Sequence, residues 1–215
     1  LAGDISDSFS MTASVRYNEY DGPVNNWARE MGTPPKMEYP LTLDTSQNPR
    51  HERETFGARL ELNLDLGNVE FKSITSYTDT ESDRLTDVDL TQLWFFNTFR
   101  PETMEVMTQE FRFSSTSDGP LQWVAGVYAM DFEETMTSTL DFGWIVIDGD
   151  DPTTGVKVPF ETRQEDKSNL AAFGNITYET GAWELGLGLR VDRWESEEEA
   201  VDIGHSASKD DVEIL

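Results

Sequence analysis

The chain reads FGARLELNLDL at residues 56–66, and this stretch decides the fold. Every second residue from Phe56 to Leu66 is apolar, and the residues between them are polar, charged or glycine. A period of two is that of a β-strand, whose successive side chains point to opposite faces of a sheet. The dipeptide Gly67-Asn68 follows directly and predicts a tight turn into a second strand that begins at Val69.

The same alternation recurs along the chain and predicts seven antiparallel strands. They span residues 8–20, 54–66, 69–78, 105–115, 121–132, 168–179 and 183–193. About ten residues of a strand tilted by about 45° cross the hydrocarbon core of a bilayer. Short turns alternate with long connections, at 21–53, 79–104 and 133–167. This pattern predicts an all-β fold, an antiparallel up-and-down transmembrane β-barrel with short periplasmic turns and long extracellular loops.

Aromatic residues at the strand ends support a position in a membrane. Trp123 and Trp183 follow short turns, whereas Tyr17 and Tyr77 end strands that enter long connections. Two aromatic girdles are therefore expected. Seven strands cannot close a barrel with an even strand number, and an open sheet would leave two unpaired edges in hydrocarbon. Residues 1–215 are therefore expected to be a fragment of a larger barrel.

Charge and composition argue against several classes of function. The 215 residues include 42 acidic and 16 basic ones, and the formal net charge of -26 disfavours binding to nucleic acid. Of the 42 acidic residues, 31 lie in the segments 21–53, 79–105, 131–168 and 192–215, so the predicted wall is much less acidic than the total suggests. Cysteine is absent, which excludes disulfides and thiolate metal sites within the chain. No stretch has the roughly 20 apolar residues of a membrane helix.

Three groups of segments resemble the barrel strands of TonB-dependent outer-membrane receptors. They are FKSITSY at 71–77, QEFRFSS at 109–115 with DGPLQWVAGVY at 118–128, and AAFGNITY at 171–178 with LGLGLR at 185–190. The resemblance implies a barrel of about 22 strands, closed by an N-terminal plug domain. It also implies a location in the outer membrane of a Gram-negative bacterium.

The resemblance further implies a transporter and not an enzyme. Its expected role is ligand-specific, energy-coupled import of a ferric siderophore, cobalamin or an oligosaccharide, with no cofactor. The implied partners are the TonB–ExbB–ExbD complex, outer-membrane lipid and lipopolysaccharide, and the ligand itself. Neither a plug domain nor a TonB box, the segment on which TonB pulls, is recognised in residues 1–215.

Two other classes of protein fit parts of the pattern. A passive porin or general channel has a similar wall, but it lacks a plug and is usually smaller. A soluble, acidic, extracellular β-sandwich that binds carbohydrate or calcium would pack its apolar strand faces against a second sheet instead of lipid.

Candidate ligand contacts are loop aromatics, which could stack on a flat ligand, and a neighbouring cation, which could pair with an anionic one. They are Trp94, Phe95, Phe96, Phe99, Arg100, Trp27 (with Arg29 nearby) and Trp144. The alternative is that these residues only pack the loops together. Asp148, Asp150 and Asp151 offer oxygen ligands for calcium, although the spacing of a complete calcium loop is missing and acidic turns are common.

Charged residues on the inward side of the strands are expected to pair with each other, with a plug, or to line a ligand path. They are Arg16, Arg59, Glu61, Arg112, Glu184, Arg190 and Asp192. The strand over 121–132 departs from the pattern, since its inward side, including Val124 and Tyr128, is not polar. His51, near Glu52 and Glu54, is the one faint candidate for catalysis, and no enzyme activity is expected.

Overall fold

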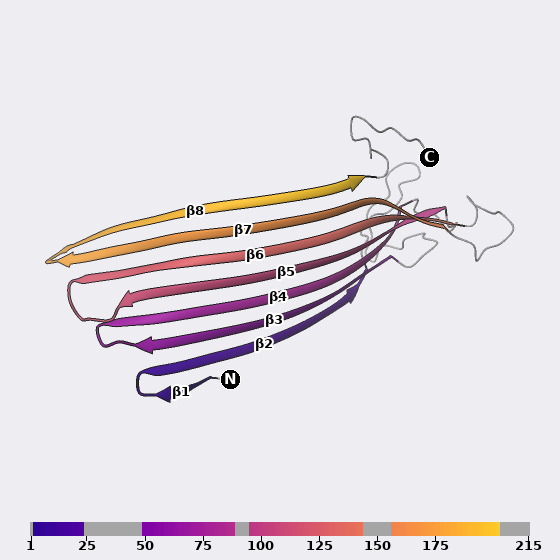
Figure 1. The fold of residues 1–215 in the computed structure, drawn as a ribbon. Coiled ribbons are helices and arrows are strands. Elements are labelled where there is room, and N and C mark those ends of the chain that lie inside the picture. Colours follow the sequence, from indigo (N-terminus) through magenta and orange to yellow (C-terminus); the bar gives the residue numbers. More distant parts are fainter. Residues whose placement is uncertain (1, 24–48, 89–94, 144–155, 203–215) are drawn as a thin grey trace, which may run out of the picture.

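The computed structural model describes residues 2–23, 49–88, 95–143 and 156–202. They form one sheet of eight antiparallel strands that lie side by side in chain order (Figure 1). The strands are β1 Ala2–Ser6, β2 Phe9–Gly22, β3 Arg50–Asp65, β4 Val69–Asp87, β5 Phe96–Ser115, β6 Leu121–Phe142, β7 Val156–Thr180 and β8 Trp183–Asp202. The predicted all-β, antiparallel up-and-down meander is therefore confirmed. Within these segments no helix has the length and hydrophobicity needed to cross a bilayer.

The strand register joins the apolar faces of successive strands into continuous rows. Leu62 lies opposite Met11 of β2 and opposite Ser73 of β4. The complete row runs through Met11, Leu62, Ser73, Phe111, Val127, Ala172 and Val191. We call the face that carries this row the outward face and the opposite one the inward face. A slip of one residue would move every apolar side chain to the other face, so the sequence fixes this register strongly.

The sheet has almost no core of its own. Apart from Pro49, Met136 and Ala171 are the only buried apolar side chains among the described residues, whereas Val15, Leu187 and Leu189 on the outward face are each 72% exposed. The chain exposes 15301 Å² of surface. A compact protein of this mass would expose about 10,000 Å². No second sheet covers the outward face in the described part of the chain, which contradicts the β-sandwich alternative.

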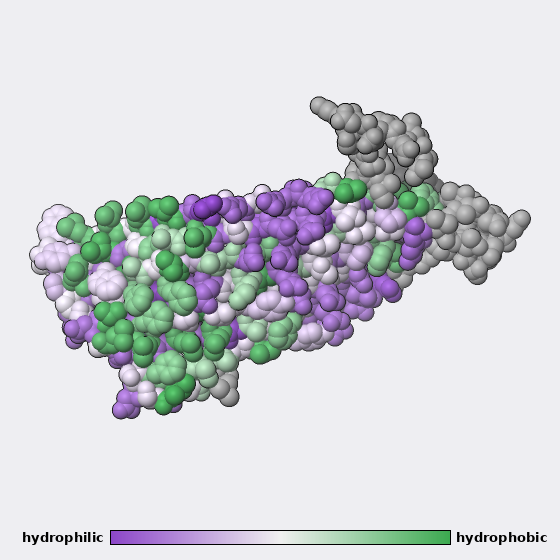
Figure 2. All heavy atoms as spheres, in the orientation of Figure 1, coloured by the Kyte–Doolittle hydropathy of each residue, from purple (hydrophilic) through white to green (hydrophobic). Residues whose placement is uncertain are grey.

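A row of carboxylates marks where the apolar part of the outward face ends. Asp79, Glu105, Glu133, Asp166 and Glu197 lie directly opposite one another on β4 to β8. Like charges in this arrangement repel, and transferring them into hydrocarbon would cost far more. The row must therefore lie in water. Figure 2 shows the same division, with hydrophobic residues gathered near the turns and hydrophilic residues towards the other end of the strands.

Tyrosines lie at the boundary between the apolar rows and these carboxylates. The Tyr17 hydroxyl donates to Glu54 Oε2 at 2.9 Å, and the Tyr77 hydroxyl donates to Glu105 Oε2 at 3.2 Å. At the turn end of the outward face, the Trp183 side chain is 73% exposed. Rings at both ends of the apolar rows are the arrangement expected of interfacial girdles.

The strands extend much farther from the turns than the sequence pattern predicts. β4 continues to Asp87 and β6 to Phe142, and β7 already begins at Val156, so large parts of the predicted connections 79–104 and 133–167 are strand. Beyond the carboxylate row neither face borders hydrocarbon, so the side chains need not alternate, while the backbone ladder continues. The apolar alternation therefore detects only the part of each strand that borders hydrocarbon.

The sequence pattern predicts seven strands, and the described residues form eight. The additional strand, β1, is five residues long, and Ile5 is its only large apolar residue, so it carries little periodic signal. The odd strand number is therefore wrong as an argument for a larger barrel. The sheet is nevertheless open, because in the described residues β1 and β8 each pair with one neighbour only.

The tight turns lie together at one end of the sheet and are linked to each other. Gly67 has a φ of 92°, a conformation that favours glycine, and its N–H donates to Asp65 Oδ1 at 2.7 Å. The Thr116 hydroxyl of the next turn donates to the Gly67 carbonyl at 2.8 Å. These contacts fix the turn end of the central strands.

Leu62→Arg should destabilise the full-length protein in bilayers by about 2–4 kcal/mol, because the charge would face hydrocarbon near its midplane. Asn63→Arg, on the inward face, should have a mild effect. The measurement is the free energy of unfolding in denaturant with lipid present. Equal losses for the two variants would contradict the assignment of faces.

Candidate functional site

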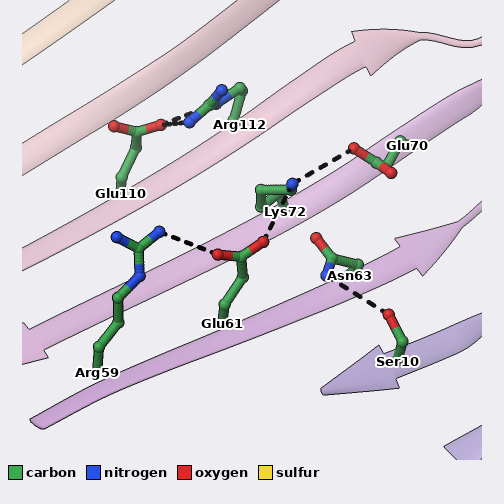
Figure 3. A network of polar contacts seen from close by, with 8 residues as sticks. All are labelled: Ser10, Arg59, Glu61, Asn63, Glu70, Lys72, Glu110 and Arg112. Atoms are coloured by element: carbon green, nitrogen blue, oxygen red, sulfur yellow. Dashed lines mark hydrogen bonds and ion pairs between the residues drawn. The ribbon is translucent and has the colours of Figure 1, made fainter. Parts of the chain in front are cut away.

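The inward face near the turns carries charges that neutralise each other (Figure 3). Glu61 lies between Arg59 Nη2, at 2.9 Å, and Lys72 Nζ, at 3.1 Å. On β5, Arg112 Nη2 lies 2.6 Å from Glu110 Oε1. Pairing of the inward charges is thus observed here, and these cations are already compensated without a ligand.

A second group on the inward face explains the strand whose inner side is not polar. Arg190 forms an ion pair with Asp192 at 2.7 Å, and its guanidinium lies 5.7 Å from the Tyr128 ring centre and 6.0 Å from that of Phe173. A Cβ at Gly126 would lie 2.5 Å from Phe173 Cζ. The inward side of β6 thus packs against the Phe173 ring and against Arg190, which is paired with Asp192. Only glycine at position 126 leaves room for the Phe173 ring.

The end of the inward face farthest from the turns differs, because its arginines do not form ion pairs with neighbouring carboxylates of the described segments. His51, Arg84 and Arg100 lie directly opposite one another on β3, β4 and β5, and we call them the basic row. Arg53 lies on the same face two residues along β3. Within the described segments, Arg53, Arg84 and Arg100 form no ion pair with a carboxylate.

The arginines of the basic row are only partly satisfied by hydrogen bonds. Arg100 Nε donates to Ser138 Oγ at 3.1 Å. Arg84 Nε is buried and has no hydrogen-bond partner. Two guanidinium groups on directly opposed residues repel each other. An anion bound between these strands would relieve the repulsion and accept the free donors.

The pKa of His51 is affected by the positive charges around it in the basic row. Burial lowers the pKa of His51 below its ordinary value, the charges of Arg84 and Arg53 lower it further, and the charge of Glu102 opposes them in part. His51 Nε2 lies 2.9 Å from Ser82 Oγ, and the ring meets Tyr20 edge to face at 5.5 Å. At neutral pH the histidine is therefore uncharged, and the arginines supply the positive charge.

Strand alternation splits the predicted aromatic cluster. Phe96 and Arg100 lie on the inward face, where Phe96 is directly opposite Phe142 of β6. Phe99 lies on the outward face, with Lys157 Nζ 5.3 Å from its ring centre. Phe95 precedes β5, and its carbonyl accepts a hydrogen bond from Gly143 N at 2.9 Å. Of the described members, only Phe96 and Arg100 can therefore act together at the lumen.

Several predicted residues lie outside the described segments. These are Trp94, Trp27, Arg29, Trp144, Asp148, Asp150 and Asp151. The weak catalytic candidate is not supported, since Glu52 and Glu54 project from β3 on the face opposite to His51. No group of three or more His, Asp or Glu side chains in the described part of the chain is placed to hold a metal ion.

The pattern of the sequence does not reveal Arg84 or Phe142 as site residues. Both lie in segments without apolar alternation, at residues predicted to be loop. The usable signal is the pairing of strands: once β4 is extended beyond Tyr77, every even-numbered residue on it, Arg84 included, faces inward.

The sequence of the chain matches the family model described as TonB dependent receptor-like, beta-barrel, over residues 3–211. The chain belongs to this family. Receptors of this family are transporters of the Gram-negative outer membrane. The family therefore agrees with the expected location and with the expectation of a transporter and not an enzyme. No curated protein matches the chain.

Solved receptor structures share the fold. The ferric yersiniabactin uptake receptor FyuA from Yersinia pestis superposes with a TM-score of 0.63 over 92% of this chain and 29% of its own. The unliganded ferric citrate transporter FecA superposes with a TM-score of 0.63 over 93% of this chain and 29% of its own. The siderophore receptor PiuA from Acinetobacter baumannii superposes with a TM-score of 0.66 over 96% of this chain and 36% of its own. Each is 16% identical, which shows the fold alone, and this chain spans about a third of each receptor.

The histidine of the basic row should titrate below its usual value of about 6.5. Because the folded protein binds this proton less readily than the unfolded chain, the contribution of His51 to stability is present above that pH and is lost as the pH falls. Arg84→Gln should raise the midpoint, and Arg112→Gln should leave it unchanged. The measurement is NMR titration of the His51 ring, assigned with His51→Gln. A midpoint at or above the usual value would contradict the described environment.

Proposed function

We propose that the complete receptor imports an anionic iron chelate across the outer membrane, with energy from the TonB–ExbB–ExbD complex. The eight strands described here form part of the wall and of the outer mouth of the lumen. Two open edges call for further strands, in a closed barrel of about 22. The plug domain and TonB box that transmit the energy belong to the rest of that receptor.

The basic row is the observation that carries the choice of ligand. Arg84 and Arg100 lie on the inward face of adjacent strands, and neither forms an ion pair with a described carboxylate; Glu102 lies on the same face, two residues along β5 from Arg100. Ferric complexes of carboxylates and catecholates carry negative charge and accept hydrogen bonds, which suits guanidinium donors. Phe96 and Phe142, on the same face, add apolar surface for the organic part of a chelate.

The similar structures agree with a chelate as the ligand. FyuA takes up ferric yersiniabactin, FecA transports ferric citrate and PiuA is a siderophore receptor. Cobalamin and oligosaccharides carry little or no net negative charge, so they would make little use of the basic row. Lipid and lipopolysaccharide would cover the outward apolar rows, and the Tyr17 and Tyr77 hydroxyls would lie near the headgroups.

The function is tested with cells that carry or lack the full-length gene. Uptake of radioactive iron is measured with ferric citrate and with a catecholate complex as anionic probes, and cobalamin and maltodextrin serve as other substrate classes. Gene-dependent uptake of an anionic complex that an uncoupler abolishes is expected. Uptake that persists with the uncoupler would indicate a passive channel, and transport of cobalamin or maltodextrin alone would refute the ligand class.

The combined variant Arg84→Gln and Arg100→Gln should weaken binding of the transported anionic chelate about tenfold to hundredfold, since a hydrogen bond to a charged group contributes about 1.5–3 kcal/mol. Arg112→Gln is the matched control, because that inward arginine is already paired with Glu110. Binding to the purified full-length receptor is measured by fluorescence quenching. Equal affinities for the double variant and the control would mean that the basic row does not contact the ligand.

A further inference from the structure

We propose that Arg16 and Arg59 form a second anion-binding subsite on the inward face, closer to the turns than the basic row. The subsite receives a negatively charged oxygen group of the imported chelate after the chelate leaves the basic row. This inference rests on the proposed function, because it takes an anionic chelate as the ligand.

A hollow of about 320 Å³ lies on the inward face across β2, β3 and β4. Gly57 lies at its floor, and the atom nearest to a Cβ at this position would be the Tyr77 carbonyl oxygen, at 3.9 Å. The missing side chain of Gly57 therefore opens the hollow. Its inward residues belong to two adjacent rows, which are Arg16, Gly57 and Thr78 and, nearer the turns, Ser14, Arg59 and Ser76.

The two arginines leave positive charge and free donors at the hollow. Arg16 forms no ion pair and no side-chain hydrogen bond with any residue that the structure describes. Arg59 Nη2 lies 2.9 Å from Glu61, but Glu61 also lies 3.1 Å from Lys72 Nζ, so two cations share its charge (Figure 3). The charge at the hollow is therefore positive.

The spacing of the two arginines suits one oxyanion between them. Arg16 and Arg59 are diagonal neighbours on adjacent antiparallel strands, and residues in this relation lie about 7–8 Å apart. Guanidinium groups bind carboxylate and similar oxygens through paired N–H donors. The hydroxyls of Ser14, Ser76 and Thr78 can donate to the remaining oxygens. No carboxylate is among the described residues that line the hollow, so an anion fits it better than a cation.

The subsite is separate from the basic row. Gly57 lies six residues from His51 along β3, which is about 20 Å at the rise of a strand. A chelate of the size of ferric citrate cannot contact both positions at once. Glu102 of β5 borders the stretch between them, but the inward residues of β3 and β4 along this stretch are neutral or basic: Arg53, Thr55, Thr80 and Ser82. An anion can therefore pass from the basic row to the hollow along these two strands.

The test compares cells that carry the full-length receptor or its variants at equal surface amounts, with radioactive ferric citrate and a ferric catecholate complex as probes. Arg16→Gln should lower the maximal rate of uptake at least tenfold. Binding to cells treated with an uncoupler should be unchanged, because the basic row still captures the complex. The combined variant Arg84→Gln and Arg100→Gln should instead weaken this binding.

Gly57→Val tests the hollow without removing a charge. A β-branched side chain suits a strand and would fill the space that the glycine leaves, so uptake should fall as it does in Arg16→Gln. This variant also serves if Arg16→Gln does not reach the cell surface. Arg112→Gln is the matched control, because this inward arginine is already paired with Glu110, and its rate of uptake should be unchanged.

Two results would overturn the proposal. One is a normal rate of uptake in both Arg16→Gln and Gly57→Val. The other is a lower Tm of the purified, ligand-free Arg16→Gln receptor together with normal uptake in Gly57→Val, which would mean that a carboxylate of the receptor itself pairs with Arg16. Failure of the proposed function is seen separately, as the absence of uptake of both complexes by the unsubstituted receptor.

Discussion

The absence of water in hydrocarbon is the constraint on which the rest of this structure depends. Every backbone N–H and C=O group at that depth must pair with a neighbouring strand. Outward side chains there must be apolar, or hydrogen-bonded to one another as Ser73, Thr75 and Gln109 are. The rows that run from Met11 to Val191 satisfy the second requirement, and the ladders of eight strands satisfy the first. Lipid therefore takes the place of the core that the chain lacks, and the open edges require the rest of a barrel.

Beyond the carboxylate row the same strands obey different rules. Neither face borders hydrocarbon there, so the side chains are not restricted to apolar residues. The inward face there holds the basic row, and Asp87 and Asn97 are buried on the outward face. Extending the wall as a rigid sheet keeps these groups in fixed register, which separate flexible loops would not do.

The sequence predicts the fold well wherever hydrocarbon constrains it. The alternation at 56–66 and the turn at Gly67 predict the faces, the hairpins and the meander, which the structure confirms. The short strand β1 and the outer parts of β4 to β7 escape prediction because no apolar alternation marks them. The candidate site is predicted only in part, through Phe96 and Arg100. Arg84 joins them by pairing across strands, and Phe99 is excluded by the alternation of faces within β5.

The most direct test of the lipid-covered face is a nitroxide scan of residues 58–65 in the full-length receptor, reconstituted in bilayers. Single cysteines would carry the label, since this chain has no cysteine of its own. Collisions with lipid-soluble oxygen should be highest at positions 58, 60, 62 and 64 and low at the positions between them. Accessibility without this alternation, or with its maxima at the odd positions, would contradict the account.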